Sequence, residues 1–148
     1  MTLTQGVFGV NIADAQHGKG LFTARTFTAG EQIGEIIGVR FLDADYSSDY
    51  CIDLGDGMAL EPAEPFRFMN HSCEPNCKLF VIYNAEDTPA ENRHVVVEAQ
   101  EIITEGIELT IDYEWPACGA IPCGCGATNC RGWIVDPTEL HLVPPYRM

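Results

Sequence analysis

The sequence predicts a mainly β fold, and three observations support the prediction. The chain of 148 residues contains several short runs of β-branched and aromatic residues, which favour extended strands. Gly, Pro, Asn and Asp separate these runs, as in a chain that turns often. No long segment shows the 3.6-residue hydrophobic period of an amphipathic helix. We therefore expect several small sheets joined by turns.

The predicted strands follow one another along most of the chain. They are residues 6–14, 20–27, 34–42, 79–84, 93–99 and 108–115. One short helix is expected at 63–70, where Phe66 and Met69 lie three residues apart on one side. It leads into the stretch "RFMNHSCEPNC", which holds an Asn, a His and two Cys.

Composition indicates one compact domain. Apolar residues make up 46% of the chain and charged residues 20%, which is ordinary for a globular protein. No apolar run approaches the roughly 20 residues that span a bilayer. The start "MTLTQGVFGVNIADAQ" lacks the basic and apolar parts of a signal peptide. We therefore expect an intracellular protein, cytoplasmic in a prokaryote or nuclear in a eukaryote or a virus, without a membrane partner.

The net charge of −14, with only eight Lys plus Arg, points to a class of partner. Binding of nucleic acid through its phosphates needs a basic face, so no direct nucleic-acid binding is expected. An acidic surface attracts a basic peptide or protein instead. The alternative is that the charge serves solubility alone.

A cysteine-rich segment begins after Pro116. Its residues bury too little apolar surface to order themselves, so the segment needs a cross-link such as a bound metal ion. Cys123, Cys125 and Cys130 are three thiolates, one short of a closed tetrahedral zinc site. The fourth ligand is open at this point, and the candidates are Cys51, Cys73, Cys77, Cys118 and His71. The alternative is that these are ordinary buried thiols.

Four motifs, in this order, resemble those of the SET-domain protein lysine methyltransferases with a post-SET cysteine tail. They are "HGKGLFTARTFTAGEQIGEIIG", "RFMNHSCEPNC", "GIELTIDYEW" and "CGCGATNCRGW", and together they span residues 17–133. The resemblance implies a SET-domain fold of several small β-sheets around a pseudoknot, where "NHSCEPN" passes beside "ELTIDY". It also implies a SET domain at 1–115, followed by a zinc-bound post-SET tail and C-terminal extension at 116–148.

The resemblance further implies a reaction and its residues. The cofactor is S-adenosylmethionine, and the acceptor is a lysine of a histone or another basic protein. The cofactor-binding positions carried over are Gly18, Lys19, Gly20, Arg67, Phe68, Asn70, His71, Tyr113 and Trp133. The catalytic positions are Tyr113, beside the transferred methyl group, and Tyr50, in the lysine channel. Cys73 becomes the fourth zinc ligand, with Cys123, Cys125 and Cys130.

These residues suit the chemistry of methyl transfer. A free lysine has a pKa of about 10.4 and arrives protonated. A narrow apolar channel beside a positively charged donor lowers that pKa, so the amine can attack the methyl group directly. Tyr rings tolerate the cation that grows on the nitrogen. At the position that governs the number of methyl groups in the family stands Ile111, which lacks a hydroxyl; we expect more than one round of methylation.

Each candidate also has an ordinary structural interpretation. Tyr113 and Tyr50 could be a core and a surface aromatic, and Asn70 could simply end a helix. His71 and Cys73 as a nucleophilic pair are disfavoured, because residues two apart rarely reach that geometry. For the whole chain the alternatives are a non-catalytic SET-fold module that binds peptides, and a zinc-stapled structural protein.

Overall fold

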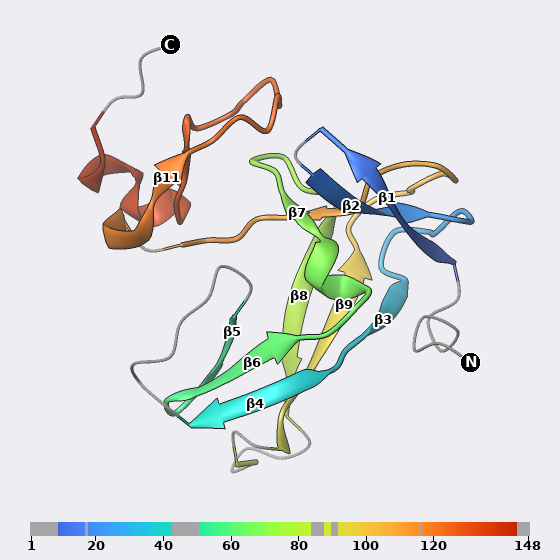
Figure 1. The fold of residues 1–148 in the computed structure, drawn as a ribbon, viewed down its shortest axis with the longest axis horizontal. Helices are drawn as coiled ribbons and strands as arrows, with labels where there is room; N and C mark the ends of the chain where they lie inside the picture. The colour runs from blue at the N-terminus through green and yellow to red at the C-terminus, as the bar shows by residue number, and fades with distance from the viewer. Residues whose placement is uncertain are drawn as a thin grey trace.

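Short strands dominate the computed structural model, which describes residues 9–16, 18–42, 51–83, 88–89, 92–115 and 117–144 (Figure 1). This confirms the prediction of a mainly β fold with small sheets. The strands are β1 (Val10–Ala15), β2 (Gly18–Thr23), β3 (Gln32–Ile36), β4 (Gly38–Leu42), β5 (Ile52–Gly55), β6 (Met58–Pro62), β7 (Asn70–His71), β8 (Cys77–Ile82), β9 (His94–Ala99), β10 (Thr110–Ile111), β11 (Ile121–Pro122) and β12 (Trp133–Ile134). Short 3-10 helices are η2 (Phe66–Phe68), η4 (Ala117–Gly119) and η5 (Pro137–Leu142).

The strands of the described residues group into sheets of two or three. The three-stranded sheets have the orders β3-β9-β8 and β4-β6-β5, and the two-stranded sheets pair β1 with β2, β7 with β10 and β11 with β12. In Figure 1 the sheet of β4, β5 and β6 and the ribbon of β1 and β2 lie at opposite ends, with β3, β8 and β9 between them. The segment with β11 extends to one side. No helix among the described residues has the length and apolarity to cross a membrane.

The core follows the period-two pattern of the strands. In β9, Val95, Val97 and Ala99 are fully buried, while the residues between them are half-buried, because successive side chains of a strand point to opposite faces. Leu21 from β2 and Leu109, which precedes β10, are also fully buried. The core therefore lies under β9 and under two of the segments that carry the sequence motifs, through Leu21 and Leu109.

The predicted crossing of the two motifs is present. Strand β7 pairs with β10 in parallel, with Asn70 opposite Thr110 and His71 opposite Ile111. The Asn76 side chain supports this pairing: its Oδ1 accepts from the Thr110 N–H at 2.9 Å, and its Nδ2 donates to the Glu108 carbonyl at 2.9 Å. Parallel neighbours cannot be joined by a tight turn, so the chain makes a long excursion between the two strands.

Several predicted elements differ in detail. The run 34–42 is divided between β3 and β4, which belong to different sheets, and a Cβ at Gly38 would collide with the carbonyl of Glu61. The expected helix at 63–70 is only the 3-10 turn η2, which ends where Met69 becomes extended. The run 108–115 is a strand only at Thr110–Ile111. Strands β5 and β6 were not predicted; they are joined through Asp56, whose φ of 54° is left-handed.

Candidate functional site

Strands β7 and β10 bring Asn70, His71 and Tyr113 together. The Tyr113 N–H donates to His71 Nδ1 at 3.1 Å, and the Tyr113 hydroxyl donates to the Met69 carbonyl at 2.7 Å. The His71 and Tyr113 rings meet edge to face, with centroids 5.4 Å apart. Both the backbone and the hydroxyl of Tyr113 are therefore fixed by the segment that carries "NHSC".

His71 is a buried imidazole whose hydrogen bonds define its tautomer. Burial lowers its pKa, and this effect outweighs the opposing influence of Asp112. Because Nδ1 accepts a hydrogen bond from Tyr113, the proton of the neutral ring is on Nε2, which lies 3.5 Å from Cys73 Sγ. His71 therefore acts as a fixed, neutral connection between the Tyr113 segment and the cysteine-bearing loop.

The side chain of Asn70 reaches strand β2. Its Nδ2 donates to the Lys19 carbonyl at 3.0 Å and to Glu108 Oε2 at 2.8 Å. A Cβ added to Gly20 would lie 2.5 Å from the same Glu108 oxygen, so this contact requires glycine. Lys19 and Gly20 of strand β2 thus lie beside Asn70. Glu108 was not singled out from the sequence, because nothing local to it indicates a partner 38 positions away.

Lys19 takes part through its backbone. Its ammonium pairs with Asp14 at 2.6 Å, but the two side chains are 56% and 89% exposed, and such surface pairs contribute little to stability. The Lys19 carbonyl, in contrast, accepts from Asn70. The main-chain contact to the cofactor that the resemblance implies for Lys19 stays a prediction.

A pocket of about 740 Å³ lies beside Tyr113. Its lining combines apolar residues with a few charged ones: Ile36, Cys51, Ile52, Asp53, Pro62, Phe66, Arg67, Met69, Pro75, Cys77, Lys78, Leu79, Gln100, Ile111, Asp112, Tyr113, Glu114 and Trp115. Pockets of this size and mixed lining are typical of ligand sites. Gly18, Gly20 and Asn70 do not line it, so the β2 side and the pocket are two separate surfaces, and the bond from Tyr113 to His71 connects them.

The remaining predicted residues are distributed between these surfaces. Arg67 lines the pocket, and its guanidinium lies 5.9 Å from the centroid of the Phe68 ring. Trp133 does not line the pocket; its Nε1 donates to the Pro144 carbonyl at 2.7 Å. Trp115 lines it instead, 5.4 Å from the Tyr113 ring. Tyr50 lies outside the described residues, next to Cys51.

Four thiols form a compact cluster above the crossing. The Sγ atoms of Cys73, Cys123, Cys125 and Cys130 all lie within 4.8 Å of one another. Cys73 Sγ is 3.9 Å from that of Cys123 and 4.0 Å from that of Cys130. Zinc–sulfur bonds of about 2.3 Å in a tetrahedron put neighbouring sulfurs about 3.8 Å apart. The donor set therefore fits a zinc ion.

The cluster also distinguishes among the five candidates for the fourth ligand. Cys77 is buried and lines the pocket, Cys51 lines the pocket, and Cys118 is exposed; none of them belongs to the cluster. Burial raises the pKa of the Cys73 thiol to about 11, a cost that a bound cation would offset. The N–H groups of Arg131 and Gly132 point at the sulfurs of Cys73 and Cys130, each at 3.4 Å.

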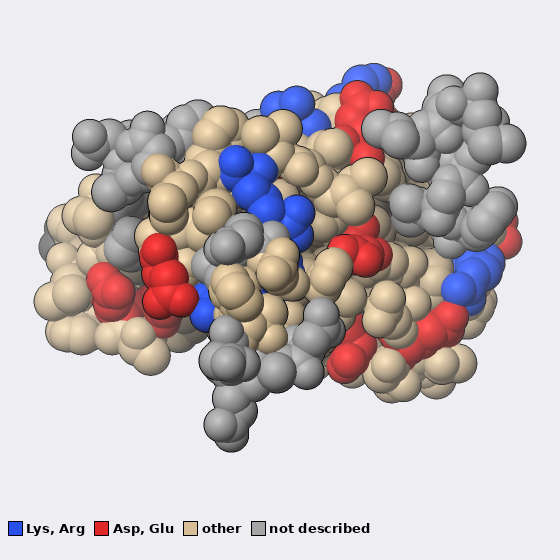
Figure 2. Space-filling model, turned by 90° about the horizontal axis from the view of Figure 1, so that it is seen from below, with Lys and Arg blue, Asp and Glu red and all other residues tan. Residues whose placement is uncertain are grey.

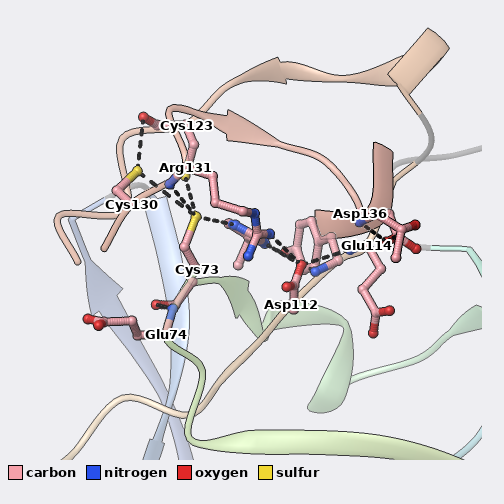
Figure 3. Close-up of polar contacts among 12 residues, drawn as sticks. Cys73, Glu74, Asp112, Glu114, Cys123, Cys130, Arg131 and Asp136 are labelled. Atoms are coloured by element: carbon pink, nitrogen blue, oxygen red, sulfur yellow. Dashed lines mark hydrogen bonds and ion pairs between the residues drawn. The ribbon is translucent and has the colours of Figure 1, made fainter. Parts of the chain in front are cut away.

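Two further residues of the site were not predicted from the sequence. Arg131 Nη2 and Asp112 Oδ1 form an ion pair at 2.9 Å, with both side chains largely buried. Figure 3 shows the Arg131 side chain running from the cysteine cluster to Asp112. Burial is the largest single influence and lowers the pKa of Arg131, but the hydrogen bond and charge of Asp112, together with the charges of Cys73 and Cys123, outweigh it and raise the pKa. The pair joins the motif that contains Asp112 to the motif that contains Arg131, 19 positions later.

Comparison with known proteins gives a consistent result. The family model described as SET domain matches residues 18–114. Histone-lysine N-methyltransferase 2B from Homo sapiens is 34% identical over 137 residues, a match that covers 81% of this chain and 5% of that protein. The chain thus spans only a small part of the length of this relative.

Solved structures share the fold. A crystal structure of KRYPTONITE in complex with mCHG DNA and SAH has a TM-score of 0.74 and 26% identity, covering 84% of this chain and 28% of the other. A second, in complex with mCHH DNA, an H3(1-15) peptide and SAH, has a TM-score of 0.68 and 28% identity, covering 84% and 29%.

Proposed function

The chain belongs to the SET domain family, and we propose that it transfers a methyl group from S-adenosylmethionine to the ε-amine of a lysine in a protein. Family membership confirms the resemblance to SET domains that the motifs within residues 18–114 predicted. The human relative is named a histone-lysine N-methyltransferase, and KRYPTONITE was crystallised with SAH, the product that remains when the donor gives up its methyl group.

The observation that carries the proposal is that Tyr113 connects two different surfaces. Tyr113 lines the pocket, and its N–H binds His71. The preceding residue of β7, Asn70, binds the Lys19 carbonyl at the start of strand β2. A transfer between two substrates needs such an arrangement, with one binding surface for each and the reacting atoms held between them.

We assign the β2 side to the methyl donor and the pocket to the lysine. When bound, S-adenosylmethionine supplies a methyl group on a positively charged sulfur. The residues proposed to hold it, through main-chain or side-chain contacts, are Gly18, Lys19, Gly20, Arg67, Phe68, Asn70, His71, Tyr113 and Trp133. Asn70 and His71 are held in place by the crossing itself, so this surface is largely built before any ligand binds.

The apolar part of the pocket favours the neutral, reactive form of a lysine. Ile52, Met69 and Ile111 line it, and desolvation by such residues lowers the pKa of an amine. Carboxylates of the same lining, such as Asp112, oppose this shift. The Tyr113 hydroxyl donates its proton to the Met69 carbonyl, so its oxygen remains an acceptor that can orient the lysine N–H. The amine proton leaves to solvent. We propose Tyr50 as the second tyrosine of this channel, because it immediately precedes in sequence Cys51, which lines the pocket.

We propose that Cys73, Cys123, Cys125 and Cys130 hold a structural zinc ion, since four thiolates close the coordination shell and leave no position for catalysis. On this interpretation residues 1–115 form the SET domain and 116–148 a tail that depends on the metal. The sulfurs come from two segments about fifty positions apart, so the ion would fasten the tail beside His71.

The proposed substrate is a lysine in a basic protein such as a histone. KRYPTONITE was crystallised with an H3 peptide, and the net charge of −14 attracts basic chains. The acidic side chains on the face in Figure 2 lie in separate groups with Lys and Arg among them. The negative charge therefore attracts a basic substrate at long range and does not form one continuous acidic patch on this face.

A histone substrate would place the protein in the nucleus. The absence of nucleic-acid binding stays a prediction, because KRYPTONITE was crystallised with DNA.

Ligand binding and methyl transfer, measured on the same protein, test the proposal. We expect both S-adenosylmethionine and SAH to raise the melting temperature, since a ligand that binds only the folded state stabilises it by mass action. Radiolabelled methyl groups should then appear on lysines of mixed histones or a cell lysate, and Tyr113→Phe should reduce the rate. No shift with either ligand would reject the enzyme. A shift without transfer to any protein would favour the non-catalytic module.

A further inference from the structure

We propose that Arg131 is a positioning residue, whose ion pair with Asp112 aligns the cysteine-bearing tail with the segment that holds Tyr113. The inference rests on the proposed methyl transfer, because Tyr113 is its catalytic residue. The metal site would fasten the tail to Cys73, beside His71. The Arg131 side chain adds a second connection, to the segment of Tyr113.

Arg131 contacts both parts of the site at once. Its backbone N–H points at Cys73 Sγ at 3.4 Å, and its Nη2 donates to Asp112 Oδ1 at 2.9 Å. The two side chains are 13% and 17% exposed. A partly buried, hydrogen-bonded pair is less screened by solvent than a surface pair, so its geometry is well defined (Figure 3).

Asp112 passes this constraint to the residues around Tyr113. The same Oδ1 that binds Arg131 accepts from the Glu114 N–H at 3.0 Å, which closes a turn over Tyr113. It also lies 3.7 Å from His71 Nδ1, the atom that receives the Tyr113 N–H. The orientation of one carboxylate therefore affects the backbone on both sides of the catalytic tyrosine.

The negative charges near the ion pair of Arg131 and Asp112 favour a positively charged side chain at position 131. Glu114 and Asp136 both lie to one side of Asp112 in Figure 3, away from the cysteine cluster. Burial, and then the charges of Asp112 and Asp136, raise the pKa of Glu114. Without the guanidinium, Asp112 would repel Glu114 and turn toward water. The backbone of residues 112–114 would then lose its fixed position.

Other contacts keep the tail attached when the ion pair is removed. Asn129 donates to Glu74 at 2.7 Å, and the Asp136 N–H donates to the Trp115 carbonyl at 2.7 Å. The backbone bond from Arg131 to Cys73 survives any change of side chain. Substitution at Arg131 should thus alter alignment rather than detach the tail or release the metal.

The test is a double-mutant cycle on the full chain. We expect Arg131→Gln and Asp112→Asn each to lower kcat for methyl transfer about tenfold, since small misplacements of catalytic groups have effects of this size or larger. The double variant should be no more than about twofold worse than either single one, because both changes break one interaction. Arg131→Lys should recover part of the rate. Bound zinc, measured by elemental analysis, should stay at the wild-type level.

Arg25→Gln is the matched control, since Arg25 pairs with Glu31 at 2.7 Å on a more exposed surface. It should leave kcat unchanged. Hydrogen exchange at residues 112–115, measured on the same proteins, should be faster in Arg131→Gln and not in Arg25→Gln.

Three results would overturn the inference: wild-type kcat in Arg131→Gln, losses that multiply in the double variant, or losses that follow loss of zinc. If the wild type itself transfers no methyl group, the proposed function fails. Hydrogen exchange at residues 112–115 then tests the positioning role of Arg131 without any activity measurement. If Arg131→Gln exchanges these hydrogens at the wild-type rate, the positioning role is rejected.

Discussion

Gly20→Ala is a substitution whose effect can be worked out from the contacts of one atom. The backbone of Gly20 is not left-handed, so alanine meets no torsional penalty there. The new Cβ would lie 2.5 Å from Glu108 Oε2 and 2.9 Å from the Ala15 Cβ. The carboxylate must therefore retreat by about 0.9 Å to reach the 3.4 Å of ordinary van der Waals contact.

This movement breaks the hydrogen bond between Glu108 and Asn70, now 2.8 Å long. A bond to a charged group contributes about 1.5–3 kcal/mol, and crowding costs about 1–3 kcal/mol. Because the carboxylate can turn toward solvent, we expect a loss of about 2 kcal/mol in the free energy of unfolding. In a chain of this length that corresponds to a fall of roughly 4–8 °C in Tm.

Binding of the methyl donor should weaken as well, since Asn70 and the first residues of strand β2, Gly18 to Gly20, form its proposed surface. A misplaced Asn70 that loses about 1.4 kcal/mol of interaction lowers affinity about tenfold. Urea denaturation gives the stability change, and calorimetric titration with SAH gives the affinity. The control is Asp14→Ala on the same ribbon, whose exposed pair with Lys19 should contribute to neither quantity. Wild-type stability and SAH affinity in Gly20→Ala would refute the argument that Glu108 requires a glycine here.

Three further predictions concern the crossing, the tail and the product. Asn76→Ala should lower the free energy of unfolding by about 2 kcal/mol in urea, because the Thr110 N–H and the Glu108 carbonyl both lose their partner; no change would mean that water replaces the amide. Chelation or Cys123→Ser should make residues 117–144 sensitive to protease and reduce methyl transfer, while the sheets stay folded; simultaneous loss of all structure would show that the metal supports the core. Ile111 should permit more than one methyl group per lysine, and exclusive monomethylation by intact mass on a peptide substrate would contradict this.

The parts of the fold that sequence reasoning predicted correctly depend on local patterns. The β-branched run at 93–99 marks β9, where Val95 and Val97 are buried, and the family resemblance, which the motifs carry, implies the pairing of β7 with β10. The hairpin of β5 and β6 was missed because its strands have four and five residues and glycine flanks both sides of Asp56. A run as short as 34–42 gave no sign that it divides between two sheets at Ile37.

The contacts that complete the site join distant positions, which explains why they were not predicted. Asn70 and Glu108 are 38 positions apart, and Asp112 and Arg131 are 19 apart. Each of these residues looks like an ordinary polar residue among its neighbours in sequence. Only the path of the chain through the crossing decides which carboxylate faces which donor. The same holds for the aromatic wall, where Trp115 rather than Trp133 lines the pocket.

The crossing also explains why a tail with little apolar surface can influence catalysis. Cys73 follows β7 by two residues, and Asp112 directly follows β10. The two attachment points of the tail therefore lie at the C-terminal ends of two strands that pair in parallel, and this pairing fixes the distance between them. The metal would hold the tail to the end of β7, and the Arg131 ion pair holds it to the end of β10. A displacement of the tail therefore has to move one strand relative to its partner, and Tyr113 lies one residue beyond the second attachment point.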